Sequence, residues 1–180
     1  MRGLAICATL LACCLPFGTF AQSNWVTREG KAIPESDTIK SKDGFNAMLL
    51  ITPDGDWHKE WDTPAEHVPH FNTSHTVKLG GELHILGFLS NPMLDPDKFA
   101  NVSCDFSVVR PDGSYSINEK NFECFKMKLE ADPKNLYVSS ATLKFLSEAS
   151  DPKGTWNVII VMRDMNRGVE LTLRDSFVNE

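Results

Sequence analysis

The chain lacks most of the features that would assign it a chemistry directly. Its 180 residues contain no run of about 20 apolar residues, the length that a membrane-spanning helix needs. They also contain no G-x-S-x-G motif, no C-x-x-C pair, no H-E-x-x-H helix and no glycine-rich phosphate loop. These absences argue against a transmembrane segment and against the common hydrolase, redox and nucleotide-binding classes. We therefore expect a protein that is not an enzyme.

Positive charge is also scarce. The chain carries 18 Lys and Arg against 24 Asp and Glu, a formal net charge of -6. No basic cluster interleaved with aromatic residues is present. Neither a nucleic acid nor an anionic membrane surface is therefore an expected partner.

The first 21 residues fit the pattern of a secretory signal peptide. Met1-Arg2 precedes an apolar stretch from Leu4 to Leu15, and Thr19-Phe20-Ala21 fits a small-x-small cleavage site. We expect cleavage after Ala21 and a periplasmic or extracellular protein. The alternative is a lipoprotein anchored at Cys13, because Leu10-Leu11-Ala12 before this cysteine fits a lipobox.

Cysteine is scarce beyond that leader, where only Cys104 and Cys124 remain. An even number of cysteines in an exported chain makes a disulfide the default. Pro111-Asp112-Gly113-Ser114 is a turn sequence, because proline presets one backbone dihedral and glycine accepts the strained one. A hairpin folded at this turn brings the two cysteines close together, so we predict a Cys104–Cys124 bond.

Short apolar or alternating segments separated by turn residues dominate residues 43–180. The segments that we predict as strands include 45–52, 82–89, 102–109, 156–163 and 169–178. Counting such segments gives seven or eight strands, and no amphipathic helix of ten or more residues is evident. This pattern predicts an all-β fold, an antiparallel β-sandwich over 43–180 with one long irregular loop. Residues 22–42 are polar and show neither period, so we expect a flexible N-terminal arm that contributes at most one edge strand.

The closing segment resembles the last hairpin of immunoglobulin-like modules in bacterial exported proteins. The resemblance rests on Gly154-Thr155-Trp156-Asn157-Val158-Ile159-Ile160-Val161, a polar turn, and a final strand ending in Phe177-Val178. It implies an Ig-like architecture and carries no site residues, because many functions share this fold. The two cysteines are too close in sequence to bridge the two sheets as in antibody domains, so the resemblance does not extend to that type.

All five histidines fall within one part of the chain, at His58, His67, His70, His75 and His84. His67-Val68-Pro69-His70 sets two imidazoles three residues apart, with Glu66, His58 and His75 available as further ligands. Imidazole and carboxylate ligands suit zinc, copper or nickel. The spacing fits no closed structural-zinc pattern, so ordinary loop histidines are the other interpretation.

Two tryptophans lie in the irregular loop over 56–75, a length of loop that is uncommon in a compact domain unless it is functional. If residues 56–62 form a helical turn, Trp57 and Trp61 share a face. That face either packs onto the sandwich or forms an exposed binding surface together with His67, His70 and Phe71, because tryptophan is enriched at the centres of interfaces.

These observations lead to three hypotheses about function. The first is an exported, non-catalytic Ig-like binding module that contacts another protein or a cell-envelope component through loop 56–75 and exposed sheet edges. It requires no cofactor. The second is a periplasmic zinc- or copper-binding protein that uses His67, His70 and His75. The third is an enzyme whose site has no recognisable motif.

Overall fold

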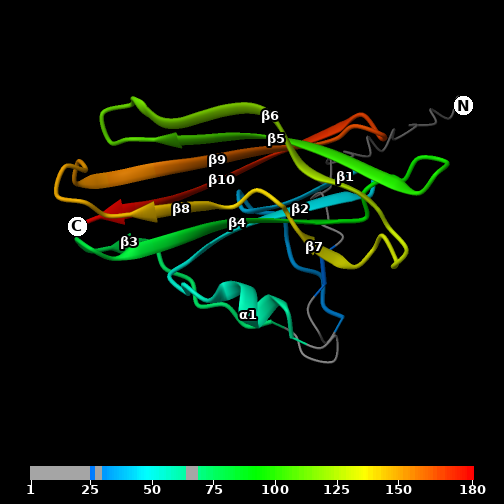
Figure 1. The fold of residues 1–180 in the computed structure, drawn as a ribbon, viewed down its shortest axis with the longest axis horizontal. Helices are drawn as coiled ribbons and strands as arrows, with labels where there is room; N and C mark the ends of the chain where they lie inside the picture. The colour runs from blue at the N-terminus through cyan, green and yellow to red at the C-terminus, as the bar shows by residue number, and fades with distance from the viewer. Residues whose placement is uncertain (1–24, 27–29, 64–68) are drawn as a thin grey trace, which may run out of the picture.

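The computed structural model describes residues 25–26, 30–63 and 69–180. In these residues the chain forms ten strands and one short helix, arranged mainly as two stacked sheets (Figure 1). In chain order they are β1 (Ile39–Lys42), β2 (Phe45–Thr52), α1 (Trp57–Trp61), β3 (Thr76–Val77), β4 (Glu82–Ser90), β5 (Phe99–Val109), β6 (Tyr115–Lys128), β7 (Leu136–Val138), β8 (Leu143–Leu146), β9 (Gly154–Asp164) and β10 (Val169–Asn179). The prediction of an all-β sandwich is confirmed.

The first sheet has the order β1-β2-β4, with β7 and β8 both pairing the outer edge of β4. The second sheet has the order β3-β10-β9-β5-β6. Two details of the prediction are wrong. The described residues form ten strands instead of seven or eight, because strands of two to four residues such as β1, β3 and β7 are too short to show a period of two. The pairing of β3 with β10 is parallel, whereas a wholly antiparallel sandwich was expected.

The core lies between the two sheets and is built by alternation along the strands. In β9 the inward residues Trp156, Val158, Ile160 and Met162 are buried, and their outward neighbours are more exposed. At Gly87 of β4 an added Cβ would collide with the end of the Met162 side chain, so glycine permits the close approach of the sheets there. No helix among the described residues is long and apolar enough to cross a membrane.

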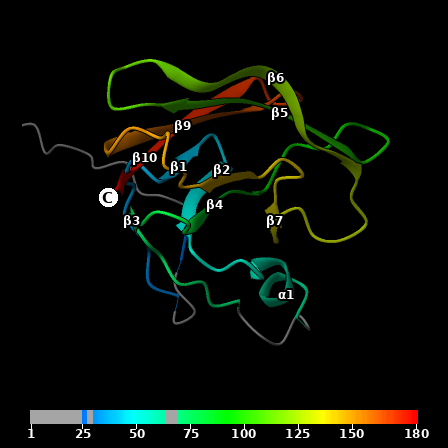
Figure 2. The ribbon, with the colours of Figure 1, turned by 60° about the vertical axis from the view of Figure 1, so that its left-hand side comes forward.

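One flank of the sandwich is closed by two segments that bond to both sheets. The segments are residues 37–38, just before β1, and residues 74–75, just before β3; Figure 2 shows β1 and β3 close to β10. Residues 37–38 belong to the stretch that we expected to be a flexible arm. The bonds are Arg174 N to Asp37 O at 2.8 Å, Leu49 N to Thr38 O at 2.9 Å, Ser74 N to Ile51 O at 3.3 Å and Val178 N to His75 O at 2.8 Å.

The opposite flank is closed by residues 139–140 together with the disulfide. Ser139 N donates to Gly87 O of the first sheet at 2.8 Å, and Ser140 N donates to Cys124 O of the second sheet at 2.8 Å. Cys124 is the extra residue of a β-bulge in β6, since it has no partner in β5. Its sulfur is bonded to Cys104, with a Cα–Cα distance of 5.7 Å, which confirms the predicted disulfide.

A buried carboxylate fixes one end of the sandwich. Asp164, at the end of β9, is 0% exposed and accepts hydrogen bonds from Met93 N at 2.8 Å and from Arg167 Nε at 3.2 Å. The guanidinium of Arg167 in turn donates to the carbonyls of Asp43 and Asn91. These contacts join the β9–β10 turn to the β1–β2 turn and to the end of β4, so the two sheets are held together at this end.

The disulfide closes a loop with a sequence separation of 20 residues. We expect the double variant Cys104→Ala with Cys124→Ala to lose about 3 kcal/mol of unfolding free energy, because the cross-link restricts the unfolded chain. Urea unfolding followed by tryptophan fluorescence measures this loss. Reduced wild-type protein is the matched control, since it keeps both side chains; unchanged unfolding midpoints in both samples would contradict the prediction.

Candidate functional site

The loop that we predicted as a binding surface covers the outer face of the first sheet. Helix α1 forms at Trp57–Trp61, and Figure 1 shows it on the outer side of β2 and β4. The ring of Trp61 lies 5.4 Å from that of Phe88, and the ring of Phe71 lies 6.0 Å from it. Phe88 is fully buried although it points away from the core between the sheets. Trp61 and Phe71 therefore pack onto the sheet, whereas the only aromatic contact of Trp57 within the described residues is to His58.

The return of this loop is held by Asp54, which follows β2. The carboxylate of Asp54 accepts hydrogen bonds from Asn72 N at 2.8 Å and from Asn72 Nδ2 at 2.9 Å. The bonds from Asn72 lower the pKa of Asp54 below its usual value, and the charge of nearby His70 acts in the same direction. The exposed part of the loop, with His70, is thus tied to the scaffold at a polar contact.

The histidines do not gather at one place in the described residues. His75 Nδ1 lies 3.1 Å from the carbonyl oxygen of Ser176 in β10, and His84 Nε2 lies 3.2 Å from a carboxylate oxygen of Glu82. No group of three or more His, Cys, Asp or Glu side chains that could hold a metal occurs in residues 25–26, 30–63 and 69–180. His67, half of the predicted His67–His70 pair, lies outside the described residues, so zinc or copper binding stays a prediction.

His75 instead forms one wall of a polar hollow in the flank closed by residues 37–38 and 74–75. The hollow has a volume of about 590 Å³, and we call it the flank hollow. The hollow is open to solvent. Its walls are the two segments that cross between the sheets, residues 37–38 and 74–75, and its floor is formed by β9 and β10. Its lining residues are Ser36, Asp37, Thr38, His75, Asn157, Arg174, Asp175 and Ser176.

Charged groups of both signs line the flank hollow. The side chain of Asp175 is 14% exposed, accepts a hydrogen bond from Ser176 N at 2.8 Å and lies 3.4 Å from His75 Nδ1. The side chains of Arg174 and Asn157 have no hydrogen bond or ion pair to any described residue. The described residues therefore leave the hydrogen-bonding capacity of both side chains unused.

No serine hydroxyl among the described residues is hydrogen-bonded to His75 in the flank hollow. An activated serine needs a hydrogen bond to its base, whereas the hydroxyl of Ser36 bonds to that of Thr38 at 3.1 Å. His75 Nδ1 lies 3.1 Å from the carbonyl oxygen of Ser176. The hollow is suited to hydrogen bonding and charge pairing with a polar ligand.

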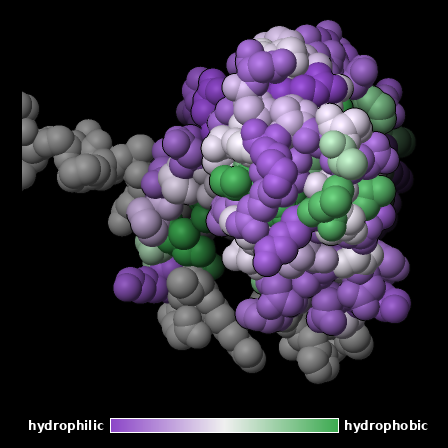
Figure 3. All heavy atoms as spheres, turned by 90° about the vertical axis from the view of Figure 1, so that its left-hand side faces the viewer, coloured by the Kyte–Doolittle hydropathy of each residue, from purple (hydrophilic) through white to green (hydrophobic). Residues whose placement is uncertain are grey.

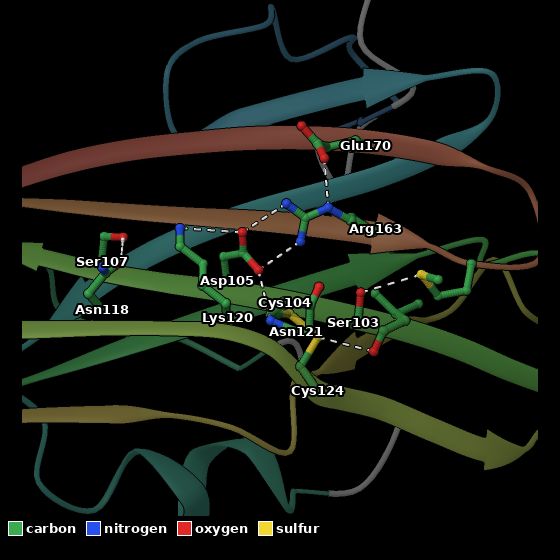
Figure 4. A network of polar contacts seen from close by, with 12 residues as sticks. Ser103, Cys104, Asp105, Ser107, Asn118, Lys120, Asn121, Cys124, Arg163 and Glu170 are labelled. Atoms are coloured by element: carbon green, nitrogen blue, oxygen red, sulfur yellow. Dashed lines mark hydrogen bonds and ion pairs between the residues drawn. A yellow bond between two sulfur atoms is a disulfide. The ribbon is translucent and has the colours of Figure 1, made fainter.

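A second cluster of charges lies on the outer face of the second sheet (Figure 4). Asp105 of β5 accepts two hydrogen bonds from the Arg163 guanidinium, both at 2.8 Å, and one from Asn121 N at 2.9 Å. Arg163 also donates to Glu170 at 2.7 Å, and Lys120 lies 3.4 Å from Asp105. The bonds from Arg163 hold the pKa of Asp105 well below its usual range, and those from Asp105 raise the pKa of Arg163. The charged side chains of this cluster are paired with one another. Because they come from β5, β6, β9 and β10, their contacts link these four strands.

Sequence reasoning found one residue of the flank hollow, His75, and missed the others. Arg174 and Asp175 are about 100 residues away along the chain, and Asp37 was assigned to the arm. One signal was present in the sequence. Asp175 takes an inward position in the alternating series of β10, between Leu173 and Phe177, where an apolar residue is expected.

Comparisons with known proteins find only weak similarities, and these concern the fold. No family model matches the chain, and no curated protein matches it. An alkylpurine DNA glycosylase from Pseudomonas fluorescens aligns at a TM-score of 0.40 and 13% identity, over 76% of this chain and 30% of that protein. A Niemann-Pick type C2 protein from the Japanese carpenter ant gives 0.40 and 10%, over 79% and 91% of the two chains. The CARDB domain of a Pyrococcus furiosus protein gives 0.41 and 10%, over 81% and 97%. None of these similarities assigns a family or an activity.

Replacing Trp61 by Ala should destabilise the protein more than replacing Trp57. Trp61→Ala removes the ring that covers Phe88, and we expect a loss of about 2 kcal/mol of unfolding free energy, below the cost for a fully buried tryptophan. Trp57→Ala is the matched control, with less than half that loss expected. Chemical denaturation measures both, and equal losses would contradict the packing of Trp61 on the sheet.

Asp105→Asn should weaken the pH dependence of the unfolding free energy in the acid range. A carboxyl group whose pKa is lowered by folding stabilises the fold fully above its unfolded pKa of about 3.9, and this contribution is lost as the pH falls further. Wild-type protein should therefore lose stability more steeply than Asp105→Asn below a pH of about 4. Urea unfolding at several pH values measures this, and Asp97→Asn, an exposed turn carboxylate, should follow the wild type. Parallel curves for Asp105→Asn and wild type would refute the assignment.

Proposed function

We propose that this chain is an exported, non-catalytic binding module with an Ig-like fold, and that it contacts another protein or a cell-envelope component. The observation that carries the proposal is the flank hollow, where the side chains of Arg174 and Asn157 have no partner among the described residues. His75, the last residue of loop 56–75, also lines this hollow. Arginine is over-represented among the residues that dominate binding energy at protein interfaces. The contact surface that we propose is the flank hollow together with residues 69–75.

The arrangement of strands supports the Ig-like part of this proposal. In the second sheet the last hairpin, β9–β10, lies beside the β5–β6 hairpin in the order β10-β9-β5-β6. This order corresponds to the G, F, C and C′ strands of variable-type immunoglobulin sandwiches. Such sandwiches carry binding residues on the loops and edges of a rigid framework.

The character of the surface supports a polar contact. Figure 3 shows the end of the molecule that faces left in Figure 1, where hydrophilic side chains dominate and apolar ones form small separate groups. A wide apolar patch would indicate an obligate hydrophobic interface. The disulfide supports export, because such bonds persist in oxidising compartments.

A photoreactive amino acid placed in the flank hollow tests the proposed surface. Substituted for Asn157 in the native host, it should give a cross-linked product with a partner, and the additional change Arg174→Gln should reduce the yield several-fold because it removes the unpaired cation. The matched control carries the photoreactive residue at Glu123, an exposed position on β6. Products of equal yield from both positions, or none from Asn157, would overturn the proposal.

A further inference from the structure

A buried amide oxygen with no hydrogen-bond partner among the described residues marks a second polar hollow. Asn46 of β2 is 6% exposed, and its Oδ1 has no hydrogen bond to any described residue. Asn46 is paired in register with Ser90 of β4, and both residues line a hollow of about 320 Å³ together with Asn91 and Lys134. We call it the Asn46 hollow. An unsatisfied acceptor costs free energy when buried, so an external donor is the expected partner.

The walls of the Asn46 hollow are held in place by hydrogen bonds. Ser90 Oγ donates to the carbonyl of Lys134 at 2.9 Å. Asn91 Nδ2 donates to Gly44 O at 2.8 Å, and the carbonyl of Asn91 accepts a bond from Arg167 Nη2 at 2.9 Å. Arg167 is itself fixed by the buried carboxylate of Asp164. The hollow is thus organised before a ligand arrives, which lowers the entropic cost of binding.

The groups that line the Asn46 hollow define the chemistry of its ligand. The ammonium of Lys134 has no acceptor among the described residues, and no acidic side chain lines the hollow. Its charge therefore favours an anion. The Oδ1 of Asn46 accepts no hydrogen bond from the described chain and requires an N–H or O–H donor. A ligand that satisfies both demands carries a carboxylate and a nearby donor.

We propose that the Asn46 hollow binds an acidic residue of a partner protein. The carboxylate pairs with Lys134, and a peptide N–H of the same segment donates to Asn46 Oδ1. Among the described residues no aromatic side chain lines the hollow, so these residues offer no ring face on which a sugar would stack. Its volume of about 320 Å³ lies near the lower end of the range for ligand pockets. This proposal rests on the proposed function, because it names the chemistry of a protein partner.

Titration with a minimal acidic residue tests the proposal. The probe is N-acetyl-L-glutamate methylamide, added to the ¹⁵N-labelled, oxidised protein and followed by amide chemical shifts. Saturable shifts are expected at residues 44–46, 90–91 and 134. The neutral analogue N-acetyl-L-glutamine methylamide should bind at least tenfold more weakly, because it lacks the charge that Lys134 recognises.

Variants decide whether the shifts come from this hollow. Lys134→Gln should weaken binding of the glutamate probe about tenfold. Asn46→Leu should abolish binding while unfolding stability stays equal or rises, because an apolar group replaces an unsatisfied acceptor. Lys153→Gln, an exposed lysine at the other end of the molecule, is the matched control and should bind like wild type.

Several outcomes would overturn the proposal. They are the absence of saturable shifts, equal binding of the two analogues, insensitivity to Lys134→Gln and Asn46→Leu, and tighter binding of glucuronate, which would indicate a sugar acid. An ordered water that satisfies Asn46 Oδ1 predicts the first of these. The cross-linking experiment at Asn157 is independent of this titration. Probe binding without a cross-link would therefore contradict the flank hollow as the contact surface, and a cross-link without probe binding would contradict this inference alone.

Discussion

The edges of a two-sheet sandwich carry backbone N–H and C=O groups that need hydrogen-bond partners, and here segments shared between the sheets supply several of them. Residues 37–38 and 74–75 close one flank, and residues 139–140 close the other beside the Cys104–Cys124 bond. The flank hollow is a consequence of this arrangement. Two crossing segments stand over β10 with polar side chains between them, and they bring His75 to Asp175 across a sequence separation of 100 residues.

The buried Asp164 carboxylate has a comparable role at one end of the molecule. It fixes Arg167, which bonds to the carbonyls of Asp43 in the β1–β2 turn and of Asn91 just after β4. A buried charge is tolerated when it is paired and hydrogen-bonded, and it then fixes its neighbours in one geometry. Asn91 is one of those neighbours and also a wall of the Asn46 hollow. The contact that joins the sheets therefore also shapes the second candidate binding site.

The parts of the structure that were predicted correctly depend on near neighbours in the sequence. Strands β2, β4 and β5 and the β9–β10 hairpin follow from apolar runs and turn residues, and the disulfide follows from a turn between two cysteines. Strand β3 was missed because its two residues show no period. Of the two tryptophans predicted to share a face, Trp61 packs onto the sheet. Its contact with Phe88 could not be derived from the sequence, because the pattern around Phe88 is that of a strand buried on both faces.

The sequence by itself determined the sandwich class, the stapled hairpin and the segment in which histidines and tryptophans gather, because alternation and turn chemistry act over a few residues. Only the tertiary structure decided which of these residues share a site. It separated His75 from His84, paired His75 with Asp175, and left the Oδ1 of Asn46 buried with no hydrogen-bond partner among the described residues. The physical reason is that a side chain's face on its strand is set locally, whereas its partners are set by the order and register in which distant strands pack.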